Sequence, residues 1–317
     1  MAKQWNRRGF LRATGAAGLL GSGTAAACSS DKADGPTAGK PVTISHIFGE
    51  TTIPEPPRRV VCAGYTGQDD LLAVGTVPVA VTDWFGDQPF AVWPWAQSKL
   101  GDAHPVVLNL DDGIPVKQIA GLKPDLIVAT NAGVDADTYQ KLSAIAPTVP
   151  QSGGDAFFEP WREQAAVIGR AVHQADRMRS VIDAVDAKFA EVATAHPGFK
   201  DKKVLLLEGR LDRGSVIVVS GWRTEFLTRM GLVVGDAPAA IEPGQIKDAL
   251  SGSDVLIWTT ESGDEHSGLL AEPGIAAVAS RSVFTTKDQA GAIAFASPLS
   301  YPLVADQLPA LIARIVG

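Results

Sequence analysis

Several motifs of common enzymes are missing from this chain. It has no GxGxxG dinucleotide fingerprint, no Walker phosphate loop and no GxSxG nucleophile elbow. Its five histidines are scattered, without the HxxxH or HxxE spacing of a zinc site. These absences disfavour an enzyme and an intrinsic metal or cofactor, although a single histidine or tyrosine could still ligate haem iron.

Long apolar runs and an excess of positive charge are also missing. No stretch is apolar enough over about 20 residues to span a membrane. The 317 residues include 28 basic and 35 acidic side chains, for a net charge of −7. Four of the basic residues and none of the acidic ones precede residue 28, so the rest of the chain carries −11. That balance argues against nucleic acid as a partner and against a basic membrane-binding face.

Residues 1–27 have the pattern of a signal peptide, with a positive start, a modestly apolar middle and small residues before a break. Arg7-Arg8, followed by Gly-Phe-Leu, resembles the twin-arginine signal. Ala25–Cys28 resembles the lipobox of bacterial lipoproteins, in which the cysteine receives a diacylglyceryl group, although alanine replaces the preferred leucine. The alternative is an ordinary cleaved signal with an incidental cysteine. Lipidation of Cys28 would leave only Cys62 and exclude an intrachain disulfide.

The rest of the chain alternates short apolar runs with amphipathic segments, which is typical of βαβ units and parallel sheets. We expect strands at 60–63, 78–82, 125–130, 203–208, 216–219 and 254–259, and helices at 67–74, 116–122, 221–230 and 301–315. Two longer helices, at 159–172 and 176–195, separate the halves, and the second has one continuous apolar stripe. The expected divisions are a flexible tether at 28–40, an N-terminal lobe at 41–155, linking helices at 156–196 and a C-terminal lobe at 197–317.

Four stretches, taken in their order and spacing, resemble a known family. They are PPRRVVCAGYTGQDDLLAVGTVPVAVTDW (Pro56–Trp84), QIAGLKPDLIVA (Gln118–Ala129), PWREQAAVIGRAV (Pro160–Val172) and LSYPLVADQL (Leu299–Leu308). They look like the solute-binding proteins of ATP-driven importers of iron chelates, haem and cobalamin, in the lipid-anchored actinobacterial form. The resemblance implies an α/β fold of two Rossmann-like lobes with central parallel sheets, joined by a long backbone α-helix, with ligand held between the lobes. It also implies a monomer that hands its ligand to an ABC permease in the cytoplasmic membrane.

One position departs from that family pattern. A glutamate often begins the helix that leads into LKPDL, and it docks on a permease arginine. Lys117 stands there in this chain, and the corresponding stretch of the second half reads Gln-Ile-Lys at 245–247. Asp111, Asp112 and Glu242 lie nearby and could replace the missing glutamate.

Ligands of open α/β sheets bind beyond the carboxyl ends of the strands, so the loops at those ends are the expected site. Aromatic rings with neighbouring arginines suit a bulky, partly aromatic anion, such as a ferric siderophore or haem. The candidate ligand-binding residues are Tyr65, Trp84, Phe85, Trp93, Trp95, Asn131, Arg210, Trp222, Arg223 and Tyr301.

Each candidate also has a structural alternative. Trp93 and Trp95 could pack a surface loop onto the first lobe. Arg210 and Arg223 could form surface ion pairs with Glu208 or Glu225, and Tyr301 could be a core residue at a helix start. The sequence as a whole predicts a lipid-anchored, extracytoplasmic binding protein for a ferric siderophore. A haem-binding protein and a transport-deficient envelope scaffold are the alternatives.

The lipid anchor can be tested separately from the ligand. We expect Cys28→Ala to prevent diacylglyceryl transfer and to leave the protein poorly retained in the membrane fraction, because a second acyl chain is what makes anchoring stable. Fractionation of cells followed by immunoblotting measures this. Unchanged membrane retention of the Cys28 variant would disprove the lipoprotein interpretation.

Overall fold

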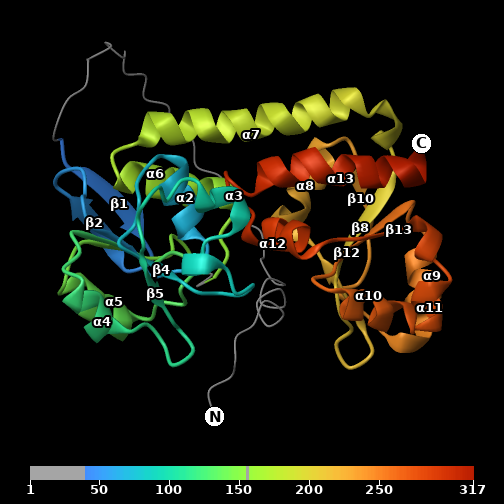
Figure 1. Ribbon diagram of the computed structural model, residues 1–317, viewed down its shortest axis with the longest axis horizontal. Coiled ribbons are helices and arrows are strands. Elements are labelled where there is room, and N and C mark those ends of the chain that lie inside the picture. The colour runs from blue at the N-terminus through green and yellow to red at the C-terminus, as the bar shows by residue number, and fades with distance from the viewer. Residues whose placement is uncertain (1–39, 155–156) are drawn as a thin grey trace.

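A computed structural model describes residues 40–154 and 157–317 of the chain. The predicted signal peptide, Cys28 and nearly all of the tether lie outside these residues. The described chain forms two α/β lobes side by side beneath one long helix, α7 (Ala175–Ala195), as Figure 1 shows. The expected two-lobed α/β fold with a helical backbone is therefore confirmed.

The N-terminal lobe is built on a five-stranded, fully parallel sheet in the order β5-β4-β3-β6-β7. Its apolar strands are short and mostly buried on both faces, as parallel strands covered by helices usually are. The predicted strands and helices of this lobe are confirmed with ends within two residues. The elements are β3 (Val60–Cys62), α2 (Gly67–Ala73), β4 (Ala80–Thr82), η1 (Pro89–Ala91), α3 (Pro94–Gln97), β5 (Val106–Leu108), α4 (Val116–Gly121), β6 (Leu126–Val128), α5 (Ala136–Ser143), β7 (Thr148–Val149) and α6 (Trp161–Ala171).

A hairpin that the sequence patterns did not predict precedes this sheet. Strands β1 (Val42–His46) and β2 (Gly49–Ile53) pair antiparallel in a two-stranded sheet of their own. Alternate residues of each strand are buried, and Ile44 and Ile53 join the main core. This alternation is the period of a strand with one face against the core and one face in water.

The C-terminal lobe has a mixed sheet in the order β11-β9-β8-β12-β13, with β10 also paired to β8. Strand β9 was expected among the parallel strands but runs antiparallel to β8. A tight connection through the Asp212–Ser215 bridge joins them, and so short a link permits only antiparallel pairing. The strands are β8 (Lys203–Glu208), β9 (Val216–Val219), β10 (Val233–Val234), β11 (Ala240–Ile241), β12 (Val255–Thr259) and β13 (Ser282–Phe284). The helices are η2 (Pro197–Phe199), η3 (Gly221–Thr224), α8 (Glu225–Arg229), η4 (Pro243–Gln245), α9 (Ile246–Ser251), α10 (Gly263–Leu270), α11 (Pro273–Ala276), η5 (Ala279–Arg281), α12 (Lys287–Phe295) and α13 (Tyr301–Val316).

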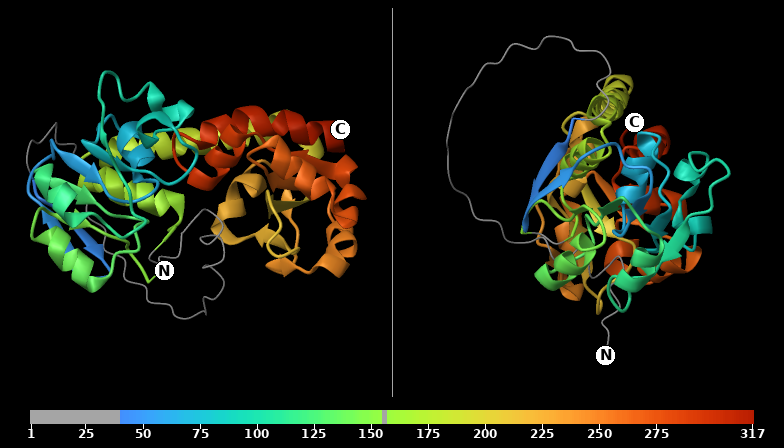
Figure 2. Two further views of the ribbon diagram at one scale, coloured as in Figure 1. Left: turned by 60° about the horizontal axis from the view of Figure 1, so that its bottom comes forward. Right: turned by 90° about the vertical axis from the view of Figure 1, so that its left-hand side faces the viewer.

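Helix α7 spans both lobes and packs along α6 and α13 (Figures 1 and 2). Its predicted apolar stripe is confirmed: Met178, Val185 and Phe189 are buried, and Ile182 and Val192 pack beside them. A helix of 21 residues is about 30 Å long, which suffices to bridge two small lobes. Among residues 40–154 and 157–317, no helix is both long and apolar enough to cross a bilayer.

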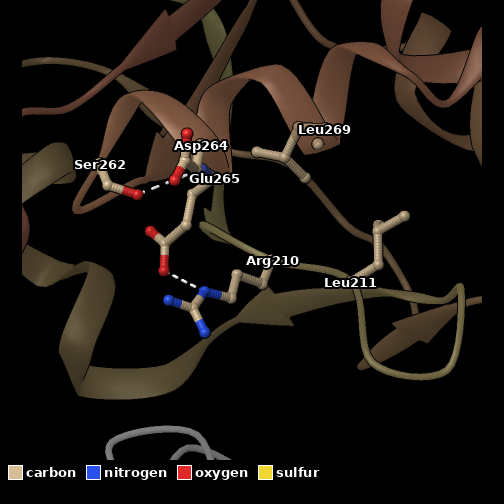
Figure 3. A pocket seen from close by; sticks show the side chains of 7 residues that line it. Arg210, Leu211, Ser262, Asp264, Glu265 and Leu269 are labelled. Carbon is tan, nitrogen blue, oxygen red and sulfur yellow. Dashed lines mark hydrogen bonds and ion pairs between the residues drawn. The ribbon is translucent and has the colours of Figure 1, made fainter.

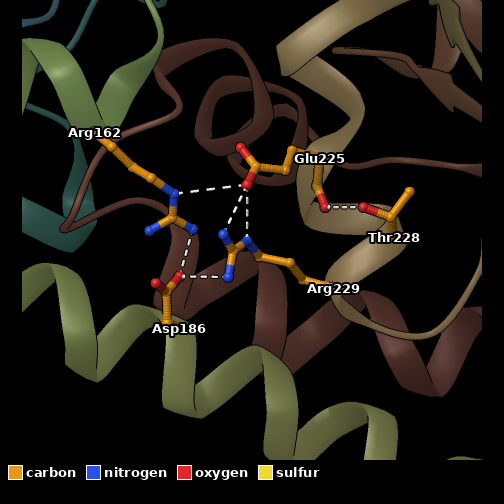
Figure 4. Close-up of polar contacts among 5 residues, drawn as sticks. All are labelled: Arg162, Asp186, Glu225, Thr228 and Arg229. Atoms are coloured by element: carbon orange, nitrogen blue, oxygen red, sulfur yellow. Dashed lines mark hydrogen bonds and ion pairs between the residues drawn. The ribbon is translucent and has the colours of Figure 1, made fainter. Parts of the chain in front are cut away.

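An ion-pair network fixes the middle of α7 to one helix on each side (Figure 4). Asp186 of α7 pairs with Arg162 of α6 and lies 3.2 Å from Arg229 of α8. Glu225 of α8 accepts a hydrogen bond of 2.8 Å from Arg229 and lies 3.7 Å from Arg162. Because these side chains are only partly exposed and share partners, the network is worth more than isolated surface pairs.

The lobes also meet where α12 and Ser297, which follows it, pack against the N-terminal lobe. The indole of Trp93 lies between Gly86 and Gly291, and a Cβ atom on either glycine would come within 2.5 Å of the ring. Ser297 donates a hydrogen bond of 2.5 Å to Asp69 of α2. We call the contacts of Trp93, Asp69, Gly291 and Ser297 the interlobe joint.

Gly291→Ala tests the joint. We expect this variant to lose about 1–3 kcal/mol of unfolding free energy, because the new methyl group overlaps a fully buried indole and the gain in helix propensity is smaller. Urea unfolding followed by tryptophan fluorescence measures the loss. Gly252→Ala is the matched control, since a Cβ there meets nothing within 4 Å and the backbone already has helical angles. Equal stability of the two variants would contradict the close packing of the joint.

Candidate functional site

Aromatic side chains gather where the strands of the N-terminal sheet end. Tyr65 follows β3, Trp84 and Phe85 follow β4, and Phe157 and Phe158 follow β7. Their rings are in contact: the centroids of Trp84 and Phe158 are 5.1 Å apart, and those of Tyr65 and Trp84 are 5.8 Å apart. Because parallel strands end at one edge, the sheet itself brings these rings together.

The C-terminal lobe adds Trp222 and Arg223 from η3 to the same group. Trp222 packs against the pair Tyr65 and Phe158. The Arg223 guanidinium lies 4.3 Å from the ring centre of Phe158 and 4.7 Å from that of Trp222, which are cation–π distances. We call Tyr65, Trp84, Phe85, Phe157, Phe158, Trp222 and Arg223 the interlobe aromatic cluster. Both lobes therefore contribute to one aromatic cluster, in which Tyr65, Phe158 and Arg223 are buried and Trp84, Phe85, Phe157 and Trp222 are half-buried.

Asn131, predicted as a ligand contact, instead positions the cluster. It is 2% exposed, with a positive φ of 52°, and its side chain is engaged on both ends. Its Oδ1 accepts the backbone N–H of Phe158 at 2.6 Å, and its Nδ2 donates to Thr66 at 2.6 Å. Thr66 in turn accepts from Gln164 of α6 at 3.0 Å. Asn131 thus ties the Phe158 loop to the lobe beneath it.

Two other predicted ligand contacts are core residues. Trp93 is 1% exposed and fills the interlobe joint, so its ring has no face for a ligand. Tyr301 is also 1% exposed, between Trp161, Phe189 and Phe226, and burial raises the pKa of its hydroxyl. Tyr301 thus occupies the core position at a helix start that the structural alternative describes.

Trp95 also belongs to the joint rather than to the interlobe aromatic cluster. Its ring stacks on Trp93 with centroids 4.9 Å apart, and its Nε1 donates to Asp69 at 2.8 Å. Half-burial leaves part of the ring exposed, but the indole N–H is already used. The tryptophan pair Trp93 and Trp95 thus serves the contact between lobes.

Arg210 lies in a different place from Arg223. It pairs with the buried carboxylate of Glu265 beside a pocket of about 370 Å³ that Asp264 also lines (Figure 3). The two arginines were expected at one edge of the sheet. They follow β8 and β9, which run antiparallel, so the carboxyl ends of these strands point in opposite directions.

Metal and thiol chemistry have little support at the site. Within residues 40–154 and 157–317, no three histidine, cysteine, aspartate or glutamate side chains lie close enough to hold a metal ion. Cys62 is buried at the end of β3, and burial raises the pKa of its thiol to about 12, which keeps it protonated. The arrangement offers aromatic surface and one cation, which suits reversible binding.

Phe157, Phe158 and Phe295 were missed in the sequence. Strand β7 has only two residues, which are too few for a sequence pattern to predict a strand. Phe157 and Phe158 were therefore not recognised as lying in a loop after the carboxyl end of a strand. Phe295 is the last residue of α12, and its ring centroid lies 5.4 Å from that of Trp84, although 211 positions separate the two residues in the chain. Such a contact depends on lobe packing, which periodicity does not report.

Known proteins resemble this chain in sequence and in fold. A family model described as periplasmic binding protein matches residues 60–290. A crystal structure of a periplasmic solute binding protein from Mycobacterium smegmatis is 62% identical, with a TM-score of 0.86, and the match covers 87% of this chain and 99% of that one.

Two curated relatives from Bacillus subtilis are more distant. The probable siderophore-binding lipoprotein YfiY is 32% identical over 49% of this chain and 46% of its own. The putative ABC transporter substrate-binding lipoprotein YhfQ is 30% identical over 55% of this chain and 52% of its own. The chain therefore spans about half the length of these two relatives.

Asn131→Gly tests the positioning role of Asn131. Glycine accepts the positive φ but removes the three side-chain hydrogen bonds of Asn131, so we expect a loss of about 1–3 kcal/mol in unfolding free energy. Asn131→Ala should lose about 1 kcal/mol more, because the left-handed backbone is strained for alanine. Chemical unfolding measures both, with Gln140→Ala on the exposed side of α5 as the control. An Asn131→Gly variant as stable as the parent would show that the Phe158 loop does not depend on Asn131.

Proposed function

Because this chain belongs to the periplasmic binding protein family, we propose that it binds a ferric siderophore outside the cytoplasmic membrane and delivers it to an ABC permease. The name of YfiY supports the siderophore, and the name of YhfQ supports the transporter. The relatives are solute-binding proteins rather than enzymes.

The single observation that carries the proposal is the interlobe aromatic cluster. Large rings offer about 150–250 Å² of contact each, and a ferric chelate presents both apolar arms and iron-bound oxygens. Arg223, held between Phe158 and Trp222, can donate hydrogen bonds to such oxygens. A ligand that touches residues of both lobes would report its binding to the permease through the surface of either lobe.

For location, we propose export by the twin-arginine signal and anchoring through a lipid on Cys28. The relatives named as lipoproteins and the lipobox-like Ala25–Cys28 support this. Residues 28–40 would then hold the folded body away from the bilayer.

For docking, we propose Asp112 and Glu242 as the acidic contacts to the permease. Both are exposed, and each lies four residues before a helix, α4 and α9 respectively. The exposed Lys117 and Lys247 occupy the second position of these two helices. Because the spacing is the same in both lobes, each lobe would present one acidic side chain to the permease.

Tryptophan-fluorescence titration of residues 41–317 with ferric siderophores, haem and cobalamin tests the proposal. We expect Arg223→Ala to weaken siderophore binding by about tenfold to a hundredfold, because charge-assisted hydrogen bonds are worth roughly 1.5–3 kcal/mol. Arg210→Ala is the matched control and should change the Kd by less than about threefold, since Glu265 already neutralises it.

Three outcomes would count against the proposal. If no ferric siderophore binds, the function is wrong. If haem alone binds, the ligand class is wrong. If Arg210→Ala weakens binding and Arg223→Ala does not, the ligand occupies the Arg210 pocket instead of the interlobe aromatic cluster.

A further inference from the structure

The interlobe aromatic cluster and the ion-pair network of α7 are built on the same two segments of the chain. Arg223 belongs to η3, which continues without a break into α8, where Glu225 is the first residue. Phe158 lies four residues before Arg162, which is the second residue of α6. One segment comes from each lobe, and Figure 4 shows the side chains that join them.

These two segments meet at two points. The Arg223 guanidinium lies 4.3 Å from the ring centre of Phe158. Two residues further along, Oε1 of Glu225 lies 3.7 Å from Nε of Arg162. Because η3 and α8 are consecutive helical turns, a shift of α8 relative to α6 also moves Arg223 relative to Phe158. The ion pair and the cation–π contact are therefore mechanically linked.

Arg162 is the member of the ion-pair network that belongs to the N-terminal lobe. Its Nη2 pairs with Asp186 of α7, and its Nε faces Glu225 of α8. Its guanidinium also lies 4.4 Å from the ring centre of Trp161, which is buried. Arg162 is thus held by its own helix while it joins that helix to two others.

The helical turns that carry Arg223 are too short to hold it in place by themselves. Helix η3 has four residues and no side-chain hydrogen bond at its N-cap, and α8 has five residues. Short 3₁₀ turns have poor hydrogen-bond geometry, so their position depends on the contacts around them. Phe226 of α8 packs on Phe189 of α7, with ring centroids 6.3 Å apart. Arg162 supplies the polar contact from α6.

Arg162 is also able to bind α8 more tightly. Its Nε and Nη1 atoms are buried and form no hydrogen bond with any residue in 40–154 or 157–317. The separation of 3.7 Å between Nε and Oε1 of Glu225 is longer than a hydrogen bond. An approach of about half an ångström or more would give a charge-assisted hydrogen bond to a donor that is otherwise buried without an acceptor.

We propose that Arg162 is a positioning residue for ligand binding, because it holds α8 against α6 and so fixes Arg223 beside Phe158. The proposal rests on the proposed function, since it assumes that a ferric siderophore binds at the interlobe aromatic cluster. A site that is already arranged loses less entropy when its ligand binds. Loss of Arg162 should therefore weaken binding through Arg223 and not through a ligand contact of its own.

The variant Arg162→Gln tests this role. We expect it to raise the Kd of the ferric siderophore that binds the parent protein most tightly by roughly three- to tenfold. Lys188→Gln is the matched control, because Lys188 is also half-buried and joins α7 to Asp306 of α13 by an ion pair of 2.7 Å. It should change the Kd by less than about twofold, since that pair touches neither α6 nor α8.

A double-mutant cycle separates positioning from general support of the fold. In the Arg223→Ala background, Arg162→Gln should change the Kd by less than about twofold, because the side chain that it positions is gone. The shift of the urea midpoint caused by Arg162→Gln should be the same in both backgrounds. A residue that supports only the fold would weaken binding equally with and without Arg223.

Hydrogen–deuterium exchange of the free protein tests the same role without a ligand. We expect Arg162→Gln to speed exchange in residues 221–224, which form η3, because α8 then loses its contact with α6. Lys188→Gln should leave exchange in this segment unchanged.

The outcomes separate the positioning role from the proposed function. An unchanged Kd for Arg162→Gln, or an equal loss of affinity in both backgrounds, would overturn the positioning role while siderophore binding stands. Unchanged exchange in 221–224 would also overturn it. If no ferric siderophore binds to the parent protein, the proposed function is wrong and the positioning role falls with it.

Discussion

The burial of Trp93 between Gly86 and Gly291 is the contact on which the arrangement of the two lobes depends. One glycine belongs to a loop of the N-terminal lobe and the other to α12, so a single indole fills space that both sides must leave open. Asp69 strengthens the same contact by accepting hydrogen bonds from Trp95 and Ser297. Burial raises the pKa of Asp69 to about 6, and the two hydrogen bonds lower it, so they stabilise the charged form against desolvation. Since this pKa lies above 3.8, the carboxyl contributes less stability as the pH rises from 3.8 to about 6.

The joint and helix α7 together determine how the proposed site can work. Helix α7 is hydrogen-bonded through 21 residues and is held by the ion pairs of Arg162, Asp186 and Arg229. A continuous helix resists bending more than extended hinge strands do, so we expect only modest lobe rotation on ligand binding. The interlobe aromatic cluster is then largely preformed, which reduces the entropy lost when a ligand binds. We expect the specificity to come from the side chains of the cluster, with Arg223 as its charged member.

The sequence predicted those features that depend on local pattern. Each strand and helix that the βαβ alternation predicted in the N-terminal lobe is present with ends within two residues, and the apolar stripe predicted α7, but short elements such as β5, β7 and α5 were not predicted. The rule that ligands bind at the carboxyl ends of strands correctly brought Tyr65, Trp84 and Phe85 together. The same rule failed for Arg210, because the direction of β9 is set by a short turn that has no hydrophobic signature. The structure buries Trp93 and Asn131, which were predicted as ligand contacts. An aromatic or amide residue in a loop has the same sequence signal whether it faces a ligand or the core. Only the packing of Trp93 and the hydrogen bonds of Asn131 distinguish the two roles.

Hydrogen–deuterium exchange of residues 41–317, with and without a saturating ferric siderophore, tests most directly whether the ligand binds between the lobes. The account predicts slower exchange in both 157–159 and 221–224, which carry Phe158 and Arg223 on opposite lobes. It also predicts unchanged exchange in 291–297 and along α7, because the joint does not move. Slower exchange in only one lobe, or slower exchange centred on residues 261–269 of the Arg210 pocket, would contradict binding at the interlobe aromatic cluster.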